Sequence, residues 1–381
     1  MTTGLDTGQL AAVVKAVEND IEAERYDGAA MVLAHRGEVV LDERIGFAER
    51  ATGRALGADD VFFTMSLSKQ FTNVAALQAV EAGRLSLSTR VAEVVPEFAA
   101  GGKERITIAD LIVHRAGLIT GFPPVPPEKI GDIGAVTAAV AAMPPESTPG
   151  ASVNYSMVAA HSVLAEVLRR ADGGHRPYRR LLAEDVFEPL GMRDSAMGLR
   201  PDLADRRVPV VARDRSPGLF EPEALEGLAA ALTEDTEIPA GGCLTTAADI
   251  ARFADAMRRG GTLDGHRVLS PASLRLATTI QTGDEVNQLF VYAKDLRGWP
   301  DFPAHLGLGF WIRGTGIYPM PFGNLASPRT FGGIGAGSTM FWVDPETELA
   351  FTFLSAGLIE ETRSYERFQR ISDLVHAAVT A

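Results

Sequence analysis

A serine and a lysine three residues apart, Ser66 and Lys69, are the side chains in this sequence best placed to do chemistry. The apolar spacing over 66–82 predicts a helix that ends at Gly83, and residues i and i+3 of a helix share a face. A serine hydroxyl is a weak nucleophile until a neighbouring base takes its proton, and a lysine amine can be that base when burial favours its neutral form. The helix N-terminus also favours a negative oxygen there. The pair therefore predicts nucleophilic attack on an acyl group.

The scarcity of lysine gives Lys69 more weight than a lysine normally has. Lysine stands at only five of the 36 Lys and Arg positions. A serine three residues before a lysine is expected by chance about 0.2 times in a chain of this composition. Apolar residues on both sides, such as Phe63 and Phe71, would bury the turn. The alternative is that Ser66 caps the helix and Lys69 is a solvated charge, and the flanks favour catalysis.

Two further segments can complete such a site. Tyr155 lies in a turn before a helix expected over 158–170, and a phenol near a serine–lysine pair can relay a proton to a leaving group. On spacing alone, a packed loop tyrosine is the simpler interpretation. Segment 331–338, FGGIGAGS, leads into a strand, and its glycines would let the backbone approach a ligand and present N–H groups to an oxyanion. The alternative for that segment is a flexible turn.

Other chemistries find little support in the sequence. It contains no G-x-S-x-G nucleophile elbow, and its histidines lack the paired spacing of metal ligands, so we expect neither a metal nor a cofactor. His114 is expected to be a packing or helix-end residue. The single cysteine, Cys243, cannot form an internal disulfide and is expected to be a small buried apolar residue.

The elements that would position these residues follow the order helix–strand–strand, a long helical middle, then three strands and a helix. Strands are expected over 29–34, 39–47, 307–313, 338–343 and 349–354, with helices at both ends of the chain. This order predicts an α+β fold in which residues 1–83 and 281–381 form an antiparallel sheet flanked by the terminal helices. Residues 84–280 are expected to form an inserted, mainly helical domain, with the active site between the two.

The composition excludes several classes of protein. The chain has 381 residues, 46% hydrophobic and 22% charged, with a net charge of −13, which is typical of a soluble globular protein. No basic patch for nucleic acid gathers anywhere, and no apolar run reaches the roughly 18 residues of a membrane span. The first residues do not resemble a secretory signal, so a cytoplasmic location is expected. The oligomeric state stays open.

Taken together, these segments resemble the serine β-lactamase and penicillin-binding-protein superfamily. The likeness is closest to the branch of class C β-lactamases and family VIII carboxylesterases. Ser66 and Lys69 match its S-x-x-K motif, Tyr155 its tyrosine motif, and 333–335 its third motif. Further segments that resemble the superfamily lie at 111–118, 187–192, 241–250 and 341–345. The resemblance implies a β-lactamase/transpeptidase-like fold, catalysis by Ser66, Lys69 and Tyr155, and an oxyanion hole of the Ser66 and Ala336 N–H groups.

Two departures from the superfamily's pattern narrow the expected substrate. The tyrosine motif commonly carries an asparagine two residues on, where this chain has Met157. The third motif normally opens with Lys or His, which helps to hold a substrate carboxylate, where this chain has Gly333 followed by Ile334 and Gly335. Met157 and residues 333–335 are therefore expected to contact substrate without supplying a cation, as in the esterase and acyltransferase branches.

The resulting prediction is a serine hydrolase that cleaves an ester, or less readily an amide, of a small acyl compound through an acyl-enzyme. Three alternatives remain: an acyltransferase using the same intermediate, a β-lactamase or D-amino-acid peptidase, and a non-catalytic acyl-binding homologue. A β-lactamase needs an anion site, for which Arg313 on a late strand is a candidate.

Overall fold

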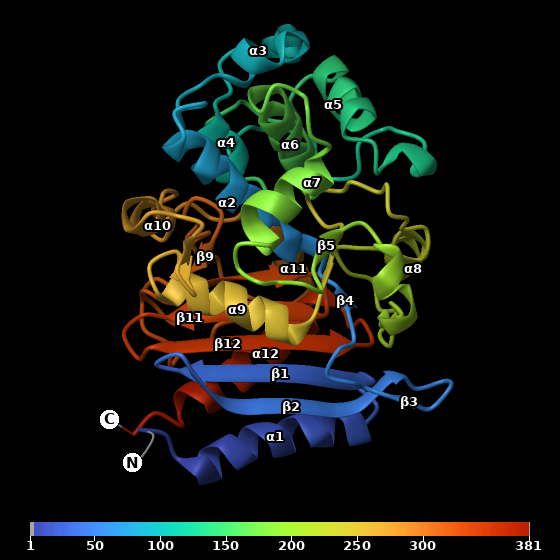
Figure 1. Cartoon of the computed structure of the whole chain (residues 1–381), viewed down its shortest axis with the longest axis vertical. Coiled ribbons are helices and arrows are strands. Elements are labelled where there is room, and N and C mark those ends of the chain that lie inside the picture. The colour runs from blue at the N-terminus through green and yellow to red at the C-terminus, as the bar shows by residue number, and fades with distance from the viewer. Residues whose placement is uncertain (1–3, 381) are drawn as a thin grey trace.

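A seven-stranded antiparallel sheet spans the molecule in the computed structural model, which describes residues 4–380 (Figure 1). Its strand order is β3-β2-β1-β12-β11-β10-β9. The strands are β1 (Gly28–His35), β2 (Glu38–Glu49), β3 (Arg54–Ala55), β9 (Trp311–Ile312), β10 (Phe331–Gly335), β11 (Thr339–Asp344) and β12 (Leu349–Ala356). First and last parts of the chain meet where β1 pairs with β12, with Ala29 opposite Ser355.

Helices cover both faces of this sheet. On one face the terminal helices α1 (Thr7–Glu22) and α12 (Glu361–His376) pack against each other, and on the other α9 (Ala247–Arg258) lies across β1, β11 and β12 (Figure 1). Every residue of β1, β11 and β12 is buried, as strands covered on both faces require. The predicted α+β fold with a sheet flanked by the terminal helices is thus confirmed.

Above the sheet, in the view of Figure 1, helices gather around α6 (Ala159–Ala171). They are α2 (Ser68–Glu81), α3 (Val91–Val94), α4 (Ile108–Ile112), α5 (Ile133–Ala142) and α7 (Tyr178–Leu182), while α8 (Pro222–Ala230), α10 (Pro271–Ala277) and α11 (Val291–Arg297) lie nearer the sheet. Two small sheets complete the fold, one of β4 (Phe62–Phe63), β6 (Cys243–Thr245) and β5 (Ala196–Met197), the other of β7 (Thr262–Leu263) and β8 (His266–Arg267). Helix α9 comes from the segment expected to be helical but packs on the sheet, and the domain boundaries stay a prediction.

The glycine-rich segment 331–338 differs most from expectation. Residues 331–335 form strand β10, and the strand expected over 307–313 shrinks to the two residues of β9. The glycines mark close packing: a Cβ on Gly332 would lie 2.1 Å from the Phe341 carbonyl oxygen, and one on Gly335 would lie 2.1 Å from that of Thr64. Because glycine has no Cβ, the backbone of β10 can pack closely against the turn before α2.

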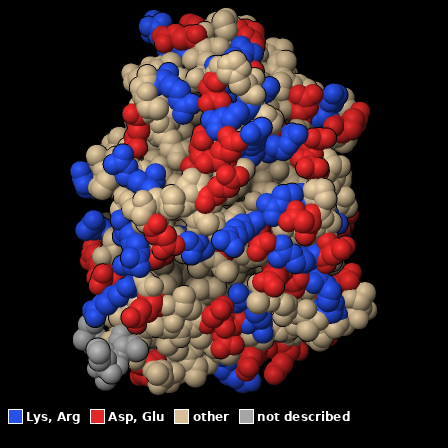
Figure 2. Space-filling view, viewed as in Figure 1, with Lys and Arg blue, Asp and Glu red and all other residues tan. Residues whose placement is uncertain are grey.

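The surface carries charges of both signs. Figure 2 shows Lys and Arg side chains interspersed with Asp and Glu over the visible face. None of the helices within residues 4–380 combines the length and the apolar character that crossing a membrane demands.

Candidate active site

Ser66 lies in a tightly held turn between β4 and α2. A single 3-10 turn, Met65–Leu67, precedes the helix, and Met65 adopts a left-handed backbone with φ 50°, which is rare for a side chain larger than glycine. The Thr64 N–H donates to the Cys243 carbonyl at 2.9 Å, and the Cys243 N–H donates to Ser68 Oγ at 3.0 Å. These bonds to β6 hold the turn in this conformation, so that Ser66 points out of it at the start of α2.

Lys69 is buried beside Ser66, with only 2% of its surface exposed. Its Nζ lies 3.2 Å from Ser66 Oγ and 2.9 Å from each of the Met157 and Ala240 carbonyl oxygens. Burial lowers the pKa of the Lys69 amine to about 7. A large fraction of the amine is therefore neutral near pH 7, which is the state that can accept a proton from Ser66.

Tyr155 completes the cluster. The Lys69 Nζ lies 4.9 Å from the centre of its ring, and the ring stacks on Trp311 with centroids 6.0 Å apart. Burial raises the pKa of the Tyr155 phenol, and a hydrogen bond with Ser66 lowers it by a smaller amount. The phenol therefore keeps its proton at neutral pH and can donate it.

His114 positions Tyr155, a role that sequence reasoning missed. Its ring stacks on the Tyr155 ring with centroids 4.2 Å apart, and its Nδ1 accepts a hydrogen bond from the Ser156 N–H at 3.1 Å. Its carbonyl oxygen accepts from the Asn154 N–H at 2.9 Å. Burial, aided by the charge of Lys69, lowers the pKa of His114 to about 3, so the ring is neutral and Nδ1 free to accept. No spacing marks this role, because α4 ends at Ile112 and His114 follows with φ 58°.

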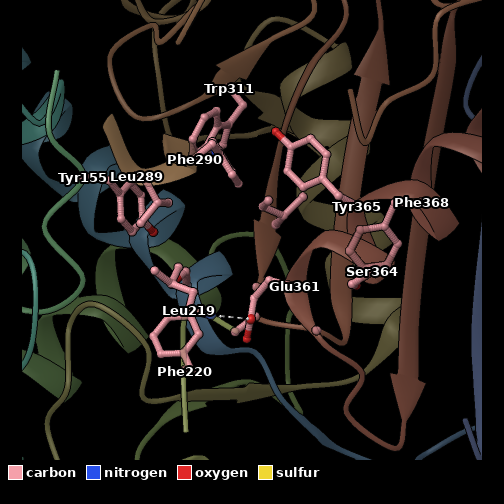
Figure 3. Close-up of a pocket in the computed structure, with 15 residues that line it drawn as sticks. Tyr155, Leu219, Phe220, Leu289, Phe290, Trp311, Glu361, Ser364, Tyr365 and Phe368 are labelled. Carbon is pink, nitrogen blue, oxygen red and sulfur yellow. Dashed lines mark hydrogen bonds between the residues drawn. The ribbon is translucent and has the colours of Figure 1, made fainter. Parts of the chain in front are cut away.

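Two cavities meet at Ser66. One, here called the aromatic cavity, has about 50 Å³ and includes Tyr155; the other, here called the Met157 cavity, has about 40 Å³. Ser66, Phe220 and Ala336 line both. The wall of the aromatic cavity, seen in Figure 3, includes Leu219, Leu289, Phe290, Trp311, Glu361, Tyr365 and Phe368. The wall of the Met157 cavity includes Phe63, Met65, Phe122, Val158, Leu225, Leu228, Ile238 and Ala240.

Glu361 supplies the carboxyl group of the aromatic cavity. Its Oε2 accepts a hydrogen bond from the Leu219 N–H at 3.0 Å, drawn as a dashed line in Figure 3. Burial raises the pKa of Glu361 to about 7. Above that pH the group is an anion in the cavity that Ser66 also lines, which disfavours a substrate carboxylate there.

The structure places most of the predicted substrate residues at these cavities. Ala336 lies in the turn after β10 and lines both, while Ile334 and Gly335 line the aromatic cavity. Met157 lines its own cavity, and its backbone carbonyl contacts Lys69, a contact that the resemblance assigns to an asparagine side chain. Gly333 instead packs on Gln70, since a Cβ there would lie 2.5 Å from the Gln70 Cδ.

Arg313, the candidate anion site, donates its hydrogen bonds to backbone carbonyl groups. The guanidinium is buried and donates to the backbone carbonyl oxygens of Gly314, Gly316 and Gly323 at 3.1, 2.8 and 2.9 Å. It braces the loop after β9 and lines neither of the two cavities at Ser66. Over residues 4–380, no three His, Cys, Asp or Glu side chains gather closely enough to hold a metal ion.

The chain is similar to known proteins over most of its length. The chain is 28% identical over 374 residues to the esterase/beta-lactamase LipL of Mycobacterium tuberculosis, covering 92% of this chain and 82% of that protein. Its fold matches a penicillin-binding protein homologue from Caulobacter crescentus with a TM-score of 0.78 at 28% identity, over 97% of both chains. It also matches a family VIII carboxylesterase with a TM-score of 0.79 at 23% identity, over 96% of both chains. The model of the Beta-lactamase family matches residues 13–375, so this chain belongs to that family.

Proposed function

We propose that this chain, a serine hydrolase of the Beta-lactamase family, cleaves esters of uncharged acyl compounds through an acyl-enzyme on Ser66. The observation that carries the proposal is the buried Lys69 amine, 3.2 Å from Ser66 Oγ and held by two carbonyl oxygens. Among residues 4–380 no carboxylate pairs with it, so burial keeps its pKa near that of a general base working at neutral pH.

Acylation follows from the positions of these groups. Lys69 takes the proton of Ser66 as Oγ bonds to the ester carbonyl carbon, and the N–H groups of Ser66 and Ala336 hold the negative oxygen. The bond to the alcohol oxygen then breaks, Tyr155 gives that oxygen its proton, and the Lys69 ammonium restores the proton of Tyr155. Water attacks the acyl-enzyme by the same route in reverse and releases the acid.

The charges around Ser66 favour a neutral ester over a β-lactam acid or a peptide carboxylate. The third motif presents Gly333 where a cation would stand, and Arg313 is bound to backbone carbonyls. Glu361 adds negative charge to the aromatic cavity above pH of about 7. An anionic substrate would lose hydration without gaining a partner.

A substrate screen tests this function. The purified protein would be assayed with p-nitrophenyl acetate and butyrate, a D-amino-acid amide and a chromogenic cephalosporin, and then labelled with a fluorophosphonate. We expect turnover of the esters and a label on the peptide that carries Ser66. Turnover of the cephalosporin well above that of the esters, or a label on another serine, would contradict the proposal.

Replacing Tyr155 by phenylalanine tests the proton donor. The change keeps the ring that stacks on His114 and Trp311 and removes only the hydroxyl. Because an alkoxide needs a proton to leave and p-nitrophenolate scarcely does, we expect kcat/KM to fall about 10²-fold for an alkyl ester and less than about tenfold for the p-nitrophenyl ester. Equal losses for the two esters would exclude Tyr155 as the donor to the leaving group.

A further inference from the structure

A groove of about 840 Å³ lies between the loop 122–132 and helix α8, next to the Met157 cavity. We propose that this outer groove binds the distal part of a long, uncharged acyl chain whose carbonyl is attacked by Ser66. The inference rests on the proposed esterase function and adds to it a substrate class, esters of medium- or long-chain acids.

The two cavities at Ser66 serve different halves of an ester. The carbonyl carbon bonds to Ser66 Oγ, so the leaving oxygen must lie near Tyr155 and the acyl carbon must point away from it. Tyr155 lines the aromatic cavity and not the Met157 cavity, whose lining residues other than Ser66 are all apolar. The alcohol therefore occupies the aromatic cavity, and the acyl chain enters the Met157 cavity.

The outer groove gives the acyl chain an apolar path beyond that cavity. Phe122 and Leu228 line both the Met157 cavity and the outer groove, so they form the partition between the two. The Met157 cavity, at about 40 Å³, has space for only a short acyl group, whereas 840 Å³ falls in the range of sites for ligands of drug size. A longer chain must pass between Phe122 and Leu228 into the groove.

Helix α8 leaves room for such a chain. Ala224, Gly227, Leu228 and Ala231 all line the groove, and their spacing of three and four residues places them on one helix face. Three of the four are alanine or glycine, and a Cβ built on Gly227 meets no atom within 4 Å. Across the groove Phe122 is 42% exposed, which leaves apolar surface for a ligand to cover.

Four of the five charged side chains that line the groove are already paired, and the fifth, Glu128, is exposed to solvent. Lys129 lies 3.3 Å from Asp132, and Asp235 lies 2.8 Å from Arg179. Glu223 pairs with Arg215 at 2.5 Å. A ligand with a charged end would have to compete with these pairs, whereas a hydrocarbon chain does not, so an apolar acyl chain is the occupant that fits.

The test blocks the groove without touching the Met157 cavity. Kinetics would be measured with p-nitrophenyl acetate, butyrate, octanoate and decanoate for the wild type, Gly227→Trp and Ala224→Trp. Ala230→Trp is the control on the same helix, since Ala230 is as exposed as Ala224 and Gly227 but lines neither the cavities nor the groove. Each methylene that leaves water for an apolar wall is expected to raise kcat/KM by about two- to fourfold.

For the wild type we expect kcat/KM to rise from butyrate to decanoate. Gly227→Trp and Ala224→Trp should each lose more than about tenfold on decanoate and less than about twofold on acetate, with Ala230→Trp unchanged on all four esters. A wild-type kcat/KM that falls steadily beyond butyrate, or identical chain-length profiles for all the tryptophan variants, would contradict the proposal that the groove binds the acyl chain. Absence of turnover on every ester would instead overturn the proposed function.

Discussion

Replacing Ser66 by alanine is expected to lower kcat/KM for an activated ester by about 10⁴- to 10⁶-fold and to abolish labelling by a fluorophosphonate. The nucleophile and its base act as a unit, so removing one member removes the acyl-enzyme route and leaves only binding and oxyanion stabilisation. The hydroxyl is partly exposed and accepts a hydrogen bond from Lys69, and it ties no other element of the fold in place, so the fold should survive its loss. Stopped-flow assays, intact-protein mass and thermal unfolding give the three readouts.

Ser68, two residues along, is the matched control. It is fully buried, shares a hydrogen bond of 2.7 Å with the Thr64 hydroxyl, and accepts the Cys243 N–H at 3.0 Å. Ser68→Ala leaves that N–H without a partner and should lower the free energy of unfolding by about 1–2 kcal/mol, while the fluorophosphonate still labels Ser66. Loss of labelling in Ser68→Ala with retention in Ser66→Ala would reverse the assignment of the nucleophile.

Replacing Lys69 by methionine is expected to lower kcat/KM by about 10³-fold, the range of a positioned general base. Methionine keeps the length and burial of the side chain and removes the amine. The wild type should show kcat/KM falling about tenfold per pH unit below pH of about 7, because protonated Lys69 cannot accept the Ser66 proton and the pKa of the amine is about 7. A Lys69→Met enzyme that keeps the wild-type rate and pH profile would exclude Lys69 as the base.

The same pKa predicts how stability depends on pH. Lysine in the unfolded chain has its usual pKa near 10.4, so between about pH 7 and 10 the unfolded state binds a proton at this position that the folded state does not. The free energy of unfolding should therefore contain a contribution that rises with pH over this window and is lost as pH falls toward 7. Chemical denaturation at several pH values should show this slope in the wild type and its loss in Lys69→Met.

Local sequence predicted the parts of the site that depend on local geometry. The spacing of Ser66 and Lys69 on one helix turn requires no knowledge of the rest of the chain, and the structure brings Tyr155 to the same point. The scarcity of lysine is weaker evidence for a catalytic role than the composition alone suggests. Lys103 is equally buried, yet its amine donates to the carbonyl oxygens of Ala100 at 2.6 Å and Ala141 at 3.1 Å and braces the helical region.

Contacts between distant segments could not be predicted in this way. His114 gains its role from a stack on a residue about forty positions later, and Glu361 lines the aromatic cavity although it opens the last helix. For the glycines of β10 the sequence leaves a flexible turn open as an alternative, because a single sequence does not show which backbone lies against a missing side chain. Tertiary packing decided each of these cases.

The pairing of β1 with β12 has a consequence for the chain as it is made. On a ribosome that adds about 5–20 residues per second, Ala29 would wait on the order of tens of seconds for its partner Ser355 to be synthesised. Over that interval β1 can pair only with β2. Its other edge, which is buried in the folded protein, is exposed in the nascent chain and can pair with other chains. Efficient production of this protein should therefore depend on temperature and on chaperones that shield nascent chains, even though the finished sheet hides that edge completely.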